Sequence, residues 1–317
     1  MTEKDIRRVL RRRMGSVSWT LVVYYGILNF MVAEVIFTES FGKTVASFPN
    51  IPPQEEILSS AMGNAWGYLL AILVGLVILM GWKGTGYVTV DLWKKKSAMT
   101  AEGFVGLLCV FVGGQIVFSL LTQLMNWLLT PLGVDITASL EAATGGADTL
   151  SMFLYGCVAA PIAEEILFRG LIQGTLRPYG KRFAIFGSAF LFGMFHGNLV
   201  QTPFAFAVGL VLGYTAETYS LLWSVVLHAF NNFVLGDLLT RLAELLPAPF
   251  GDLLSGMILL AFTVAGIVIL ILRRREVREY FAVEGMDRRC LRGFFMNSGM
   301  IVFLLLMLAN MLLMLGM

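Results

Sequence analysis

Long apolar stretches alternate with short polar segments along almost the whole chain. Each stretch is close to the length of about 20 residues that a helix needs to cross a bilayer. The stretches are continuously apolar and do not alternate residue by residue, which favours helices over the strands of a barrel. The pattern therefore predicts an all-α polytopic membrane bundle with about nine transmembrane helices. The predicted spans are 16–37, 61–82, 103–129, 149–168, 183–200, 203–219, 222–239, 253–272 and 294–316.

Basic residues gather in every second gap between these spans. In a nine-span arrangement 21 of the 23 Lys and Arg residues lie on one side, and only Lys43 and Arg241 lie on the other. The positive-inside rule then predicts a cytoplasmic N-terminus and a C-terminus outside. The basic stretch 273–292 is expected to anchor this topology at the inner surface. The first apolar stretch lacks a small-residue cleavage site, so we interpret it as a retained span and not as a signal peptide.

The composition excludes most soluble classes of protein. Hydrophobic residues make up 57% of the chain and charged residues 14%, whereas a soluble domain carries about 25% charged residues. A soluble enzyme, a disordered protein and a nucleic-acid partner are therefore not expected. The three cysteines, Cys109, Cys157 and Cys290, form no CxxC motif and predict neither disulfides nor a zinc knuckle. Without repeats or linkers, residues 1–317 are expected to form a single membrane domain.

Ionisable side chains at membrane depth are costly and mark candidate functional sites. The first cluster lies at the end of the fourth span, where Glu164 and Glu165 precede Arg169. Glu165 and Arg169 are four residues apart on one helical face and are expected to pair. Glu164 points in another direction and has Phe168 at the fourth position after it. Because the span ends before Arg169, we expect Glu164 to lie at a shallow depth.

Two further clusters contain the only two histidines of the chain. Phe192 and His196 share one helix face, as do His228 and Asn232, while Asn231 points away. For His196 the structural alternative is a histidine packed in the core. For His228 and Asn232 it is a polar clamp between helices. The functional interpretation is that their side chains converge with Glu164 in one cavity.

The order EExxxR, FxxxH and HxxxN on consecutive spans resembles the CPBP family of intramembrane proteases (also called ABI), which process CAAX prenyl proteins and bacteriocins. The resemblance covers 149–239, a catalytic core within the membrane domain, and every motif position that we know is present. It implies an intramembrane endopeptidase, a peptidase that hydrolyses a peptide bond of a membrane-associated substrate. In this reading Glu165 and Arg169 support the site.

The resemblance also assigns catalytic roles. Glu164 is implied to be the general base that activates a water, and His196 to orient that water. His228 and Asn232 are implied to stabilise the oxyanion of the tetrahedral intermediate. A desolvated carboxylate and amide or imidazole donors are compatible with this chemistry.

Metal dependence is open on the residues alone. Glu164, His196 and His228 could form the two-histidine, one-carboxylate set of a catalytic zinc ion, as the metalloprotease label of the family suggests. Three separate helices would supply these ligands, and no second carboxylate would remain as base. Asn232 beside His228 also fits an oxyanion pair better than the carboxylate or carbonyl expected behind a metal-bound histidine. We therefore favour a metal-independent mechanism, with Zn²⁺ as the alternative.

Other functions remain as alternatives. A non-catalytic membrane scaffold or bacteriocin-immunity protein could keep the same residues for packing. A transporter would require internal repeats, and the sequence shows none. The expected partners are a peptide or lipidated peptide substrate and membrane lipid, and the expected location is a bacterial plasma membrane. The sequence leaves the oligomeric state open.

Overall fold

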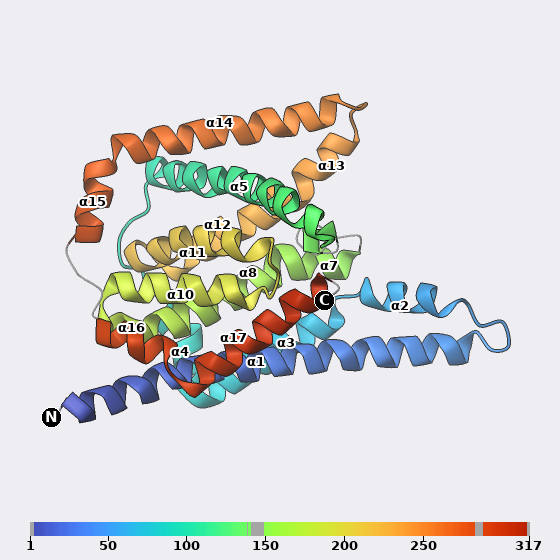
Figure 1. Cartoon of the computed structure of the whole chain (residues 1–317), viewed down its shortest axis with the longest axis horizontal. Helices are drawn as coiled ribbons and strands as arrows, with labels where there is room; N and C mark the ends of the chain where they lie inside the picture. Colours follow the sequence, from blue (N-terminus) through green and yellow to red (C-terminus); the bar gives the residue numbers. More distant parts are fainter. Residues whose placement is uncertain (1–2, 138, 141–148, 283–287, 316–317) are drawn as a thin grey trace.

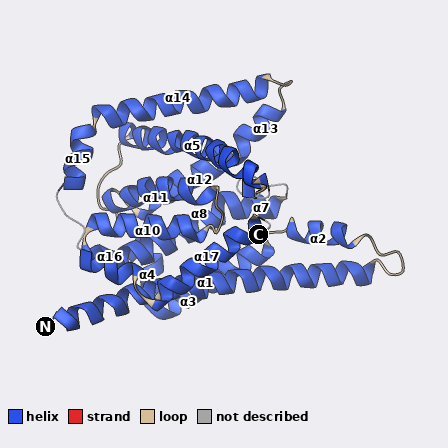
Figure 2. Cartoon of the chain, in the orientation of Figure 1, coloured by secondary structure: helices blue, strands red, loops and turns tan. Residues whose placement is uncertain are grey.

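The computed structural model describes residues 3–137, 139–140, 149–282 and 288–315. Every regular element in this part of the chain is a helix, which confirms the all-α prediction (Figure 2). The helices preceding the site are α1 (Glu3–Ala46), α2 (Gln54–Met62), α3 (Trp66–Lys83), α4 (Thr85–Thr89) and α5 (Ala101–Leu129). Those following it are α14 (Phe250–Leu272), α15 (Arg274–Ala282), α16 (Arg288–Phe295) and α17 (Ser298–Met314).

Four consecutive helical segments form the motif region, and all but the third carry motif residues. The first is one continuous helix of residues 150–179, here called the motif helix. It contains α7 (Leu150–Leu154), α8 (Ala160–Glu165) and α9 (Gly174–Leu176), with π-helical stretches at Tyr155–Ala159 and Ile166–Gln173 and a 3₁₀ turn at Arg177–Tyr179. Next come α10 (Lys181–Phe195) and α11 (Gln201–Thr218). The last segment joins α12 (Leu221–Phe230), a π-helical stretch at Asn231–Leu238 and α13 (Leu239–Glu244).

Six helices of the described residues are long and apolar enough to cross a membrane, and the bent pair α16 and α17 would make a seventh. The prediction of nine spans is therefore not confirmed. With 15 residues, α10 is shorter than a span, and α11 has polar residues at both ends. Both helices lie inside the bundle against other helices (Figure 1). Their surfaces are therefore covered by protein and do not need the uniform apolarity of a helix surrounded by lipid.

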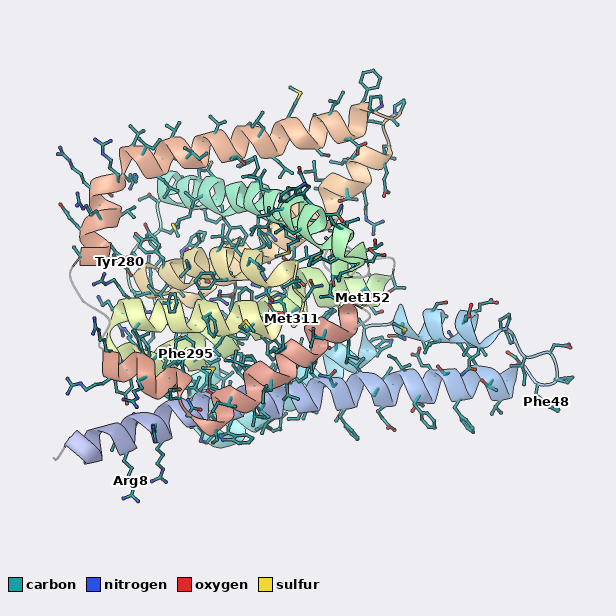
Figure 3. The ribbon with its side chains drawn as sticks, viewed as in Figure 1. Arg8, Phe48, Met152, Tyr280, Phe295 and Met311 are labelled. Atoms are coloured by element: carbon teal, nitrogen blue, oxygen red, sulfur yellow. The ribbon has the colours of Figure 1, made fainter. Side chains whose placement is uncertain are left out.

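The exposed surface of the outer helices is apolar, as expected for contact with lipid. On α14 a stripe of large side chains is more than half exposed, comprising Leu253, Met257, Leu260, Val264, Ile267 and Ile271. The two labelled ends of the chain lie on opposite sides of the bundle (Figure 1). Arg8 and Tyr280 lie near the side of the N-terminus, and Phe48 lies near the other side (Figure 3). Which side faces the cytoplasm stays a prediction.

Close contact between α10 and α11 depends on glycine. A Cβ atom at Gly193 would lie 2.8 Å from the Thr202 carbonyl oxygen, which no larger residue could tolerate. The turn between the two helices passes through Gly197, whose φ of +55° favours glycine. Asn310 of α17 donates a hydrogen bond to the Gly197 carbonyl oxygen at 3.0 Å. These contacts fix the turn that carries His196.

The predicted end of the fourth span at residue 168 is wrong. The helix continues through Arg169 to Tyr179, and Arg169 is buried within the bundle. Glu164 therefore lies near the middle of a 30-residue candidate span and not at a shallow depth. An arginine can continue a buried helix when its charge is paired inside the protein, so Arg169 was a misleading marker of the membrane surface.

Candidate active site

Glu165 and Arg169 form the ion pair that their spacing predicts. Glu165 Oε1 lies 3.1 Å from Arg169 Nη1, and both side chains are fully buried. Arg169 also donates from Nη2 to the Gly209 carbonyl oxygen at 3.2 Å. Its guanidinium lies over the ring of Phe192, 4.3 Å from the centroid. The arginine thus connects the motif helix to α10 and α11.

Two residues of α12 also contact the Glu165 carboxylate. His228 Nδ1 lies 3.0 Å from Oε1, and Ser224 Oγ donates to Oε2 at 2.5 Å. Ser224 and His228 are four residues apart, so one face of α12 carries both. Ser224 was not predicted as a site residue, because a serine within an apolar helix is common and forms no part of the motifs.

Glu164 lies outside this network but close to it. Its Oε2 is 3.8 Å from His228 Nε2, and its side chain is 24% exposed, whereas that of Glu165 has no exposed surface. The phenol groups of Tyr24 and Tyr155 are close enough to Glu164 to interact with its charge. The adjacent glutamates therefore differ: one is held by three partners, and the other faces the imidazole nitrogen that Glu165 leaves free.

The helix around the two carboxylates is irregular. Pro161 lies shortly before Glu164 in the chain and lacks a backbone N–H. π-helical stretches lie on both sides of α8. A π stretch widens the helix and shifts the faces that later side chains occupy. Neither of the two π-helical stretches was predicted from the sequence.

His196 lies at the end of α10 with its ring fixed by Phe192. Its Nδ1 lies 2.8 Å from the Phe192 carbonyl oxygen, so Nδ1 donates and Nε2 carries the lone pair. The Phe192 ring packs edge-on against His196, with 4.9 Å between ring centroids, and against His228, with 5.7 Å. The predicted shared face of Phe192 and His196 is confirmed, and Phe192 is the common neighbour of both histidines.

Asn232 is connected to the motif helix and to a neighbouring asparagine. Its Nδ2 donates to the Gly156 carbonyl oxygen at 2.9 Å, and its Oδ1 accepts from Asn231 Nδ2 at 3.1 Å. The second N–H of the Asn232 amide is not used by these bonds. Asn231 in turn accepts from Gln115 of α5 at 3.1 Å. Asn231 therefore does not simply point away as expected, since it orients the Asn232 amide.

A ladder of polar contacts fixes the motif helix to α11. Arg169, Gln173 and Arg177 recur every fourth residue and contact Gly209, Gly213 and Glu217, which have the same spacing. Gln173 Nε2 donates to the Gly213 carbonyl oxygen at 2.9 Å, and Arg177 Nε donates to Glu217 Oε1 at 2.9 Å.

Glu217 is part of an ion-pair cluster. It also lies 3.5 Å from Lys96 Nζ. Lys96 follows α4 and lies outside the candidate spans. Burial lowers the pKa of Lys96, and the charge of Glu217 opposes that shift. The cluster ties the segment before α5 to the end of α11.

The described residues do not group three His, Cys, Asp or Glu side chains closely enough to hold a metal ion. The donor chemistry alone would suit zinc, since both histidines have Nδ1 engaged and Nε2 available. Contrary to our expectation for His228, a carboxylate does lie behind that imidazole.

A comparison with known families identifies this segment. Residues 146–234 match the family model for type II CAAX prenyl endopeptidase Rce1-like proteins. The match includes all three motifs and agrees with their resemblance to the CPBP family. Residues 146–234 are therefore similar to the catalytic core of the CPBP family. No curated protein and no solved structure matches the chain. Helices α1 to α5 and α14 to α17 lie outside the CPBP core that is matched.

Proposed function

We propose that the chain is an intramembrane endopeptidase that hydrolyses a peptide bond of a membrane-associated substrate. The observation that carries this proposal is the different placement of two adjacent carboxylates. Glu165 is fully buried and bound to Arg169, His228 and Ser224. Glu164 is partly exposed and lies 3.8 Å from the free nitrogen of His228. A purely structural pair of glutamates would not require this asymmetry.

Glu164 is the proposed general base. Peptide hydrolysis by water requires a carboxylate within reach of that water and a second group that holds it. His196 can accept a hydrogen bond from the water at Nε2, because its Nδ1 is engaged by the Phe192 carbonyl oxygen. Glu164 then takes a proton from the water as its oxygen attacks the substrate carbonyl carbon, and later transfers that proton to the leaving amine.

His228 and Asn232 are proposed to bind the developing oxyanion. Asn232 retains one N–H after donating to Gly156. His228 can donate from Nε2 only in its doubly protonated form, since Nδ1 is directed at Glu165. Fixed donors of this kind stabilise a transition state more than the neutral ground state. Glu165 and Arg169 hold His228 in place and do not contact the reacting atoms.

The proposed substrate is a lipidated or otherwise membrane-anchored peptide, of the prenylated CAAX type or the bacteriocin type, cleaved near its C-terminus. A site within the bundle is accessible to a segment that the membrane holds nearby. We infer that the enzyme works in a bacterial plasma membrane with its basic side in the cytoplasm. The proposed mechanism is independent of metal.

Comparative proteomics of membranes tests the proposal. Cells that express the wild type, Glu164→Ala or the control Glu56→Ala would be compared by mass spectrometry of peptide C-termini. Glu56 is exposed on α2, far from the motifs. We expect at least one membrane-associated protein to keep its C-terminal residues in the Glu164→Ala cells alone. Identical C-termini in all three membranes would contradict the proposal.

A further inference from the structure

A continuous groove runs between α1, α3 and the motif helix. It consists of two adjoining cavities of about 390 Å³ and about 450 Å³. Ser16, Thr20, Trp82 and Leu171 line both cavities, so the two are parts of one groove. The inner part reaches Ala163, the neighbour of Glu164, and the outer part ends beside Thr175.

The inner part of the groove is suited to a hydrocarbon chain. Its lining is dominated by aliphatic and aromatic side chains. The two hydroxyls that both parts share are already used within α1: Ser16 Oγ donates to the Arg13 carbonyl oxygen, and Thr20 Oγ1 donates to the Ser16 carbonyl oxygen, both at 2.8 Å. A peptide backbone placed here would lack partners for most of its N–H and C=O groups, and unpaired backbone groups are strongly disfavoured inside a membrane. An acyl chain has no such requirement.

The outer part of the groove is positively charged. Arg12, Arg13 and Lys83 line it, and no acidic side chain does. In the part of the chain that the structure describes, none of the three forms an ion pair with an acidic side chain. Lys83 Nζ lies over the Trp82 ring, 4.4 Å from its centroid. These cations are therefore available to an anionic group at the end of the groove.

The apolar inner part and the cationic outer part of the groove follow each other as the acyl chain and the phosphate do in a membrane phospholipid. Ala163 and Thr175 are 12 residues apart, roughly 18 Å along a helix at 1.5 Å per residue. That is close to the roughly 15 Å of hydrocarbon in one leaflet. A lipidated peptide in the same orientation would place its lipid, and not its peptide bond, beside Glu164. The groove therefore suits a resident lipid better than the proposed substrate.

We propose that this groove binds one anionic phospholipid. Arg12, Arg13 and Lys83 bind the phosphate, and the acyl chain lies along the motif helix as far as Ala163. The site is independent of the proposed protease activity, since it uses none of the motif residues.

Tryptophan fluorescence provides a direct test, because Trp19 lines the inner part of the groove and Trp82 lines both parts. The full-length protein, with Trp66, Trp93, Trp127 and Trp223 replaced by Phe, would be titrated with phospholipids brominated on the acyl chain. We expect brominated phosphatidylglycerol to quench the two remaining tryptophans at a much lower mole fraction than brominated phosphatidylcholine. The bromine atoms quench only at short range, so this preference reports occupation of the groove.

Two charge variants decide the outcome. The triple variant Arg12→Gln, Arg13→Gln and Lys83→Gln should weaken the preference for phosphatidylglycerol roughly tenfold or more. The matched control replaces Arg274, Arg275 and Arg278 of α15 by Gln, which removes the same charge outside the groove and should leave the preference unchanged. The pair Arg12→Lys and Arg13→Lys should also retain it. Equal quenching by the two lipids, or equal loss in the α15 control, would overturn the proposal.

Discussion

Glu165 and His228 join the motif helix to α12, with 3.0 Å between Oε1 and Nδ1. This bond fixes the direction of the imidazole, so that Nε2 faces Glu164 at 3.8 Å. The fully buried carboxylate of Glu165 thus sets the orientation of His228. The other ring nitrogen of His228 faces the partly exposed carboxylate of Glu164. The two glutamates of the first motif act on opposite nitrogens of one ring.

Ser224→Ala should destabilise the protein and weaken catalysis. The change removes the donor to Glu165 Oε2 and leaves a buried carboxylate with one partner fewer, at a cost of about 1.5–3 kcal/mol. Thermal unfolding in detergent and turnover of the purified enzyme would measure the two effects. The control Ser18→Ala removes a buried hydroxyl that bonds only within its own helix, and it should change neither quantity appreciably. A stability of Ser224→Ala equal to that control would contradict the prediction.

Glu164→Gln should abolish cleavage while preserving the fold. The amide keeps the volume of the side chain but cannot accept a proton, and loss of a general base reduces rates by roughly 10²–10⁴. Since Glu164 lies outside the Glu165 network, the melting temperature should stay close to that of the wild type. Cleavage of an identified substrate and thermal unfolding would be measured on the same preparation. Full activity in Glu164→Gln would show that the catalytic assignment is wrong.

In contrast to Glu164→Gln, Arg169→Ala should cause a large loss of stability. The change leaves Glu165 charged and buried without its main partner, and breaking a buried pair in this way costs about 3–5 kcal/mol. It also removes the bond to Gly209. The yield of folded protein and its melting temperature should both fall well below those of Glu164→Gln. Unchanged stability would mean that the pair contributes little to the fold.

The sequence predicted which site residues share a face within a single helix. The pairing of Glu165 with Arg169 and the common face of Phe192 and His196 follow from helical periodicity alone. The partners between helices could not be predicted, because Ser224 and Gln115 are ordinary residues whose role depends on which helices pack together. Arg169 misled the assignment of span ends, since sequence does not reveal whether an arginine at the end of an apolar run meets water or a buried carboxylate.

The fold was predictable in class but not in its count of spans. Continuous apolar runs require helices in a membrane, and α14 and α5 follow this rule directly. Both α10 and α11 are surrounded by protein, so their length and polarity follow packing requirements that a hydropathy pattern does not contain. No residue pattern indicated the π-helical stretches on either side of α8.

Cysteine labelling would test the predicted orientation. The three native cysteines are buried, so single cysteines at Gln54 and Glu279, both exposed, would give a clear signal. An impermeant maleimide should label the first in intact cells and the second only after lysis, as the distribution of basic residues predicts. The reverse pattern would contradict the orientation. Labelling of both sites from the same side would contradict an arrangement in which they lie on opposite sides.

Chelation should leave the activity of the purified enzyme intact, because the proposed mechanism relies on Glu164 and the donors around it. The same experiment tests the alternative, a zinc-dependent mechanism. His196 and His228 both direct Nδ1 at an acceptor, the arrangement that commonly lies behind metal-bound histidines, so Nε2 of each ring would be available to a metal ion. Elemental analysis of active enzyme, with turnover measured before and after exhaustive chelation, separates the two mechanisms. Near-stoichiometric zinc, with activity lost on its removal and restored on its return, would replace the glutamate mechanism by one in which the metal activates the water.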